Sequence, residues 1–249
     1  MKILVANPNT SAGVTDRLVA SGQLVASPGT ELLPMTAPRG VPYIATRAEA
    51  AIGGAVMLEM LAERRGTFDA AICAAFGDPG LGGARELFDF PVVGMAEAAM
   101  LAACMLGRSF GIVSFSRSLE PWFAEIVAWH GLSGRCAAIA TLDEAFKSID
   151  DVQEEKEQVL VDLANRTVAD RGADVVILAG APLAGLANKI ADRVPVPLVD
   201  GIQAAVMMAE GLVRLKPRKA TAGTYRRPAP KESTGLAPAL ADLIGHKDA

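Results

Sequence analysis

Histidines and cysteines, the side chains that most readily exchange a proton near neutral pH, are few in this sequence and scattered along it. The two histidines, His130 and His246, lie far apart, and neither has a carboxylate at metal-ligand spacing. His130 stands beside Gly131 at the expected end of a helix, so we expect it to face solvent and the helix dipole. The sequence therefore predicts no metal site, and the lack of a glycine-rich nucleotide loop predicts no cofactor.

The segment Asp69–Leu81 brings candidate groups to the end of a buried strand. Its apolar run stops at the turn Gly77-Asp78-Pro79-Gly80, and ligands bind at the carboxyl ends of strands in parallel sheets. Asp78 could exchange a proton there, but an aspartate in such a turn more commonly caps the backbone. We interpret the loop Phe76–Gly80 as one part of a functional rim.

The thiols and hydroxyls of the chain are weaker candidates for a catalytic group. Cys73 lies two residues before Ala75 on the same face of the strand, which places it roughly 6–7 Å further back. A small buried core residue is therefore the favoured interpretation of Cys73. Cys104, on an expected helix, and Cys136, in an expected surface turn, are weaker still. Ser114 ends another strand without a Ser–His–Asp set, so it fits a binding donor better than a nucleophile.

Short apolar strands alternate with helical segments, which predicts an α/β fold with parallel sheets. The strand–loop–helix units fall into two halves and indicate two pseudo-symmetric lobes. We place residues 1–100 and 206–249 in the first lobe and residues 101–205 in the second, and expect the proline-rich stretch from Lys216 to form a tail that packs over the body or is partly ordered. The expected strands are 2–6, 31–35, 70–76, 91–95, 109–115, 137–139, 173–178 and 196–199. The expected helices are 15–21, 48–64, 81–87, 97–105, 119–130, 143–171 and 201–215, with a turn near Asp150 and Asp151 inside the segment 143–171.

Composition limits the classes of protein to which this chain can belong. Hydrophobic residues make up 51% and charged residues 21% of the 249, so a large core forms readily. The net charge of -4 comes without a basic stripe, which argues against nucleic-acid binding. Apolar runs stay below the ~18 residues of a membrane span, and no leader peptide is expected. Three cysteines without metal spacing favour a reducing, cytoplasmic setting.

Two groups of polar residues could contact a ligand. Asn9, Thr10 and Ser11 follow the first strand, and the helix N-terminus there offers N–H groups to an anion, with a plain cap as the alternative. Arg47 would bind a carboxylate through a bidentate contact if it entered a cleft. A solvated arginine at a helix start is the alternative for that residue.

Four stretches of the chain resemble one known family. Met1–Ser11, Phe76–Leu81, Pro91–Met100 and Val196–Val206 are similar, in this order, to the hydantoin/allantoin racemase branch of the Asp/Glu racemase superfamily, and so is Tyr225–Lys231. The resemblance covers nearly the whole chain. It implies two doubly wound α/β lobes with an active site in the cleft between them. It also implies a small-molecule ligand, hydantoin-like or a carboxylate, a homo-oligomer and no cofactor.

The chemistry of that family raises a question about this sequence. The resemblance implies a two-base mechanism, in which one thiolate removes the proton from the carbon next to a carbonyl and another thiol returns a proton on the opposite face of that carbon. One cysteine directly precedes the Phe-Gly-Asp-Pro loop, where this chain has Ala75. The other lies in a Leu-Gly-Cys-Ala-Gly turn, which aligns with Leu178–Pro182 and puts Gly180 at the cysteine position. By this alignment both acid/base groups are absent, because neither a methyl group nor a hydrogen carries a proton.

The resemblance also suggests which residues hold the substrate. Pro182 replaces a glycine and removes one backbone N–H that could bind an oxygen, and Arg47 falls near an aromatic position of the family. The expected substrate-binding residues are Asn9, Thr10, Ser11, Arg47, Phe76, Gly77, Ser114, Phe115, Ala181 and Pro182, and the weak catalytic candidates are Asp78, Cys73 and Ser114.

Three functions stay open on this basis. The favoured one is an enzyme that acts on a small cyclic amide or carboxylate by non-racemising chemistry, namely hydrolysis, decarboxylation or isomerisation. The second is a racemase of hydantoins or amino acids with a non-standard base. The third is a catalytically inactive protein that binds the same kind of ligand.

Overall fold

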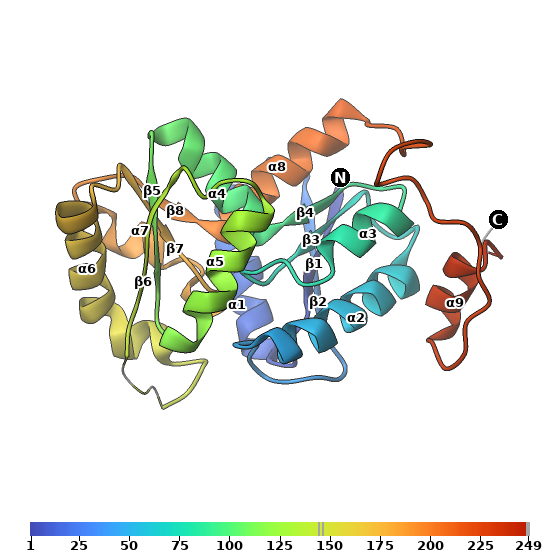
Figure 1. Cartoon of the computed structure of the whole chain (residues 1–249), viewed down its shortest axis with the longest axis horizontal. Coiled ribbons are helices and arrows are strands. Elements are labelled where there is room, and N and C mark those ends of the chain that lie inside the picture. Colours follow the sequence, from blue (N-terminus) through green and yellow to red (C-terminus); the bar gives the residue numbers. More distant parts are fainter. Residues whose placement is uncertain (144, 146, 248–249) are drawn as a thin grey trace.

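Two four-stranded parallel sheets lie side by side and form the frame of the molecule (Figure 1). The computed structural model describes residues 1–143, 145 and 147–247. The first sheet has the strand order β2-β1-β3-β4 and the second β6-β5-β7-β8, so the two repeat one topology. This confirms the α/β fold with two pseudo-symmetric parallel-sheet lobes. The strands are β1 (Lys2–Asn7), β2 (Glu31–Thr36), β3 (Ala70–Cys73), β4 (Val92–Gly94), β5 (Phe110–Ser114), β6 (Cys136–Thr141), β7 (Val175–Leu178) and β8 (Leu198–Asp200).

Helices cover the faces of both sheets, and α1, α4 and α5 lie toward the middle of the molecule (Figure 1). Short 3-10 turns lie between strands and helices of the second lobe: η1 (Arg117–Leu119), η2 (Ala181–Leu183) and η3 (Ala191–Arg193). The helices are α1 (Ala12–Gln23), α2 (Arg47–Arg64), α3 (Leu81–Leu87), α4 (Met95–Leu106), α5 (Glu120–Trp129), α6 (Val152–Arg171), α7 (Leu186–Ile190), α8 (Gly201–Leu215) and α9 (Pro238–Ile244).

The central strands are apolar on both faces because helices cover both sides of each sheet. In β1, Ile3 and Val5 belong to a core cluster that continues into the second lobe. Leu4 and Ala6, which alternate with them, pack into a separate cluster under α2, α3 and α9. This period-2 alternation distributes one strand between two cores. The cluster that both lobes share holds the two sheets together.

The chain returns to the first lobe at its end. Helix α8 packs against α4 and against β1, β3 and β4, and α9 packs against α2. On this packing we propose the lobe boundaries near residues 100 and 206. None of the described helices is long and apolar enough to cross a membrane.

Two local expectations differ from the structure. The helix expected from residue 143 starts only at Val152, after the expected turn near Asp150 and Asp151, and positions 144 and 146 lie outside the described residues. Cys136 opens strand β6 and is not in a surface turn. The tail contains helix α9, which packs against α2. Pro238 occupies the first turn of α9, a position where the missing N–H of proline costs nothing.

Candidate functional site

A small pocket lies where the strand-end loops of the two lobes meet. Its volume is about 20 Å³, which is the space of a single water molecule. Carbon-rich side chains dominate its walls. The first lobe contributes Asn9, Tyr43, Ile44, Ala75 and Phe76, and the second contributes Leu119, Trp122, Phe123, Gly180, Ala181 and Pro182.

Ala75 and Gly180 occupy equivalent positions in the two lobes. β3 ends at Cys73 and β7 ends at Leu178, so each residue comes two positions after the third strand of its sheet. Both residues line the pocket. The two positions that the alignment singled out therefore share one pocket, although they are about 105 residues apart in the sequence.

The loop after β3 is a tight turn with little room for side chains. Gly77 has φ +131°, and Asp78 and Gly80 are also left-handed at +49° and +81°. A Cβ on Gly77 would lie 2.3 Å from Cζ2 of Trp122, so this glycine is required both by its φ and by the indole packed on it. The close approach of Trp122 seals one side of the pocket.

The turn after β1 is organised by its asparagines. Oδ1 of Asn9 accepts hydrogen bonds from Nδ2 of Asn7 at 3.0 Å and from the Ser11 backbone N–H at 2.9 Å. In the described part of the chain, Nδ2 of Asn9 makes no hydrogen bond, and Asn9 lines the pocket. An amide with its oxygen engaged and its NH₂ available can donate to a ligand carbonyl.

The N-terminus of α1 already holds a carboxylate from the second lobe. Ser11 caps the helix, since its Oγ accepts from the Val14 N–H, and the same Oγ donates to Oδ1 of Asp150 at 3.0 Å. Thr10 donates its backbone N–H to the Val41 carbonyl at 3.0 Å. The anion-binding potential of this helix start is therefore used between the lobes, and neither Thr10 nor Ser11 lines the pocket.

Arg47 lies on the surface and pairs with Glu125 of α5. Its Nε is 2.9 Å from both carboxylate oxygens of Glu125, and Nη2 is 2.5 Å from Oε1. The arginine side chain is 61% exposed, so it does not enter the pocket. The pair raises the pKa of Arg47 and lowers that of Glu125. It ties α2 of the first lobe to α5 of the second.

His130 is buried between two carboxylates, contrary to the expectation that it faces solvent. Its side chain is 6% exposed, with Nε2 3.3 Å from Oδ2 of Asp78 and Nδ1 3.5 Å from Oε1 of Glu97. Burial favours the neutral ring, but the two carboxylates outweigh it and raise the pKa of His130 to about 9. Arg85 completes the cluster through its ion pair with Glu97.

Asp78 anchors α4 rather than its own turn. Its carboxylate accepts the backbone N–H groups of Ala96 and Glu97, both at 2.9 Å, which satisfies the start of that helix. Burial raises the pKa of Asp78 even though His130 and these N–H groups oppose the shift. The side chain is fully enclosed and is not part of the pocket lining.

The remaining candidates lie behind the pocket walls. Oγ of Ser114 donates to the Ala179 carbonyl at 2.8 Å, and Sγ of Cys73 lies 3.4 Å from the Pro79 carbonyl. Burial raises the pKa of the Cys73 thiol well above its ordinary value. Phe115 packs on Tyr43, with ring centroids 5.6 Å apart. Among the described residues, no group of three His, Cys, Asp or Glu side chains could hold a metal ion.

Of the residues that the sequence suggested for the site, six line the pocket: Asn9, Ala75, Phe76, Gly180, Ala181 and Pro182. The aromatic wall was missed. The missed lining residues are Tyr43, Ile44, Leu119, Trp122 and Phe123. In a chain with only 5% aromatic residues, the adjacent aromatic pair at 122 and 123 within the expected helix 119–130 was a weak signal, because such a pair is equally typical of a core. Tyr43 is the titratable side chain of the lining, and burial raises its pKa well above the ordinary value.

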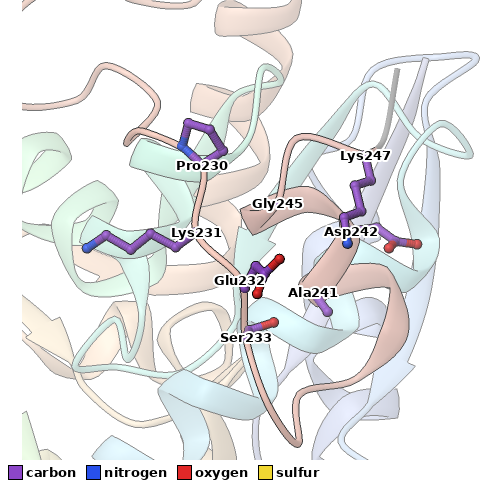
Figure 2. Close-up of a pocket in the computed structure, with 8 residues that line it drawn as sticks. All are labelled: Pro230, Lys231, Glu232, Ser233, Ala241, Asp242, Gly245 and Lys247. Atoms are coloured by element: carbon purple, nitrogen blue, oxygen red, sulfur yellow. The ribbon is translucent and has the colours of Figure 1, made fainter.

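A larger hollow lies in the tail, away from the lobe junction. It has a volume of about 360 Å³, and Figure 2 shows that loop 230–233 and helix α9 surround it. Lys231 and Lys247 stand with Glu232 and Asp242 around it. This mixture of charges favours no particular ligand, so the pocket between the lobes is the better candidate site.

Known proteins resemble this chain along almost its whole length. The family described as Asp/Glu/Hydantoin racemase matches residues 3–209. A hydantoin racemase from Paenarthrobacter aurescens is 32% identical over 234 residues, which cover 93% of this chain and 99% of that protein.

Two solved structures share both fold and sequence with the chain. Allantoin racemase from Klebsiella pneumoniae superposes with a TM-score of 0.91 at 33% identity, covering 96% of this chain and 98% of that one. Allantoin racemase from Pseudomonas fluorescens gives a TM-score of 0.88 at 32% identity, covering 94% and 100%.

Proposed function

The chain belongs to the Asp/Glu/hydantoin racemase family, and on that premise we propose that the pocket between its lobes binds a small neutral cyclic amide of the hydantoin type. We further propose that it does not invert this ligand through a pair of thiols. The observation that carries both statements is the shared location of Ala75 and Gly180 in the pocket lining.

Stereoinversion by proton exchange needs an acid and a base on opposite faces of one carbon. The two lobes supply a methyl group and a hydrogen at Ala75 and Gly180. Tyr43 is buried with a raised pKa, so it stays protonated near neutral pH and is a poor base. Cys73, Asp78 and His130 lie outside the lining, and their bonds are made within the protein.

The surroundings of the pocket favour a neutral ligand over a carboxylate. Arg47, the arginine that could have bound an anion, is paired with Glu125 on the surface. The N-terminus of α1 is occupied by Asp150. Asn9 offers an amide donor, and the aromatic rings offer apolar faces, which is the usual composition of a small-molecule site.

Catalysis without racemisation is the second candidate. Asn9 favours it, because an available amide N–H aimed at a carbonyl oxygen would also stabilise an enolate-like state. Hydrolysis, decarboxylation or isomerisation of a cyclic amide would then give product without exchange of the carbon-bound hydrogen. A single donor provides only part of what such steps need, so binding is the function that the geometry supports better.

Calorimetry and isotope exchange in D₂O test the proposal together. We expect hydantoin to bind and aspartate to bind more weakly, with no deuterium incorporated into a chiral 5-substituted hydantoin. Rapid exchange by the unaltered protein would contradict the loss of proton chemistry. Tight aspartate binding without hydantoin binding would contradict the ligand class, and product without exchange would establish the second candidate.

Asn9→Asp gives a matched variant for the same test. It keeps the oxygen that accepts from Asn7 and Ser11 and removes the NH₂ donor. We expect weaker hydantoin binding. The melting temperature should also fall, because the new carboxylate is buried, so binding is compared at a temperature at which both proteins are folded. Asn165→Ala, on α6 and bonded to the Val161 and Arg193 carbonyls, is the control for loss of an amide elsewhere.

A further inference from the structure

The space that a side chain at position 180 would fill is taken by an aromatic ring. Gly180 has φ +116°, and a Cβ built on it would lie 2.8 Å from Cε1 of Phe115. Real Cβ atoms do not approach an aromatic carbon so closely, and the positive φ itself disfavours any other residue. The glycine and the ring therefore depend on each other.

Phe115 stands directly behind the pocket wall. It follows the last residue of β5 and is fully buried. Its ring contacts Gly180 on one side and Tyr43 on another, and both of these residues line the pocket although Phe115 does not. Removal of the ring would open apolar space that is continuous with the pocket, and close-packed neighbours fill such a space only in part.

We propose that Phe115 is the residue that sets the size of the ligand in this site. Its ring fills the volume that a side chain at 180 would occupy. The pocket itself holds only about 20 Å³, so a ligand enters when a wall moves, and Phe115 then restricts that ligand to compact rings, such as hydantoin with hydrogen or methyl at carbon 5. The inference rests on the proposed function for the identity of the ligand. The packing of Phe115 against Gly180 stands independently of it.

Ligand size is tested by binding of hydantoin and 5-benzylhydantoin to the unaltered protein and to Phe115→Ala. We expect the ratio of the two affinities to shift by about tenfold or more toward the benzyl compound, as for a change of several carbons in an apolar pocket. Phe110→Ala is the control, because Phe110, the first residue of β5, is as fully buried as Phe115 and does not line the pocket. An unchanged ratio in Phe115→Ala, with hydantoin still bound, would overturn the proposal.

A double-mutant cycle, read out as melting temperatures, tests the contact between Phe115 and Gly180 without any ligand. Gly180→Ala is made both in the unaltered protein and in the Phe115→Ala variant. If the new methyl group clashes with the Phe115 ring, Gly180→Ala should lower the melting temperature at most half as much in the Phe115→Ala variant as in the unaltered protein. Phe115→Leu serves in the same way if Phe115→Ala does not fold. Equal losses in both backgrounds would overturn the proposal. If hydantoin fails to bind but the losses differ, the proposed ligand is wrong and the packing role of Phe115 is upheld.

Discussion

Nε2 of His130 lies 3.3 Å from Oδ2 of Asp78 although the two residues belong to different lobes. Asp78 follows Ala75 in the loop after β3, and His130 ends α5, whose Trp122 and Phe123 form part of the pocket. The contact therefore fixes the pocket wall from the second lobe onto the strand-end loop of the first. Since the imidazole also faces Glu97, the closure of the pocket is linked to the protonation of one side chain.

The protein is expected to lose stability in alkaline solution through His130. Its folded-state pKa of about 9 is above the unfolded value of about 6.5. The stabilisation is therefore fully present below pH 6.5 and is lost as pH rises through 9. We expect a contribution on the order of 2 kcal/mol near pH 6, allowing for solvent near the ring. Melting temperatures between pH 6 and pH 10 measure it.

His130→Gln is the comparison for this titration. The glutamine is neutral at every pH, so the difference in melting temperature between the two proteins should shrink as the pH passes 9. Tyrosine, lysine and cysteine titrate in both proteins and cancel in that difference. A difference that stays constant from pH 6 to pH 10 would mean that His130 is neutral in the folded protein.

Gly77→Ala is expected to destabilise the protein by about 3 kcal/mol or more. The new methyl group would lie 2.3 Å from the indole of Trp122, and alanine would be strained at φ +131°. Gly82→Ala is the control, because Gly82 lies within α3 and a Cβ there meets Trp129 at an ordinary 3.6 Å. A helical glycine replaced by alanine gains up to ~1 kcal/mol. Urea denaturation of both variants provides the comparison, and equal stabilities would refute the packing role of Gly77.

Cysteines introduced at Ala75 and Gly180 should allow exchange of the carbon-bound hydrogen of a hydantoin only when Phe115 is also replaced by a smaller residue. The variant with Ala75→Cys and Gly180→Cys places a side chain against the Phe115 ring, so we expect a lower melting temperature and little activity. In the Phe115→Ala background the cysteine at 180 should cost less melting temperature than in the unaltered background, and the triple variant should allow deuterium exchange into a chiral hydantoin. Ala75→Cys alone is the control with a single thiol. Exchange absent from the folded triple variant would argue against the alignment that assigns these two positions.

The sequence was sufficient to predict the strands, their parallel arrangement and the two repeated lobes, because apolar periodicity is local. Helix α3 matches its expected limits, and Ala75 and Gly180 line one pocket as the shared topology requires. The partners of charged side chains were not predictable. His130 lies 52 residues from Asp78, and a single histidine at a helix end gives no local sign of a buried carboxylate pair.

The same limit applies to Arg47 and to the start of α1. Their positions suggested anion binding, but Glu125 and Asp150 of the opposite lobe take those contacts. Only the packing of one lobe on the other decides whether such a cation or helix end faces a ligand or a carboxylate of the protein. The aromatic wall was missed for a related reason, since Trp122 and Phe123 on α5 resemble any core pair in sequence.

Arg47→Ala is expected to speed ligand association with little effect on stability. The pocket holds only about 20 Å³, so α5 or the loop that carries Tyr43 must move before a hydantoin can bind. The Arg47–Glu125 pair holds α5 from the first lobe, and an ion pair this exposed to solvent is only a weak tether. Its loss should raise the association rate about two- to fivefold, measured by stopped-flow quenching of tryptophan fluorescence, and should speed hydrogen exchange in α5. Arg39→Ala is the matched control, since Arg39 forms a similar bidentate pair with Glu59 inside the first lobe and does not contact α5. Equal rates for the two variants would show that α5 is not the moving wall.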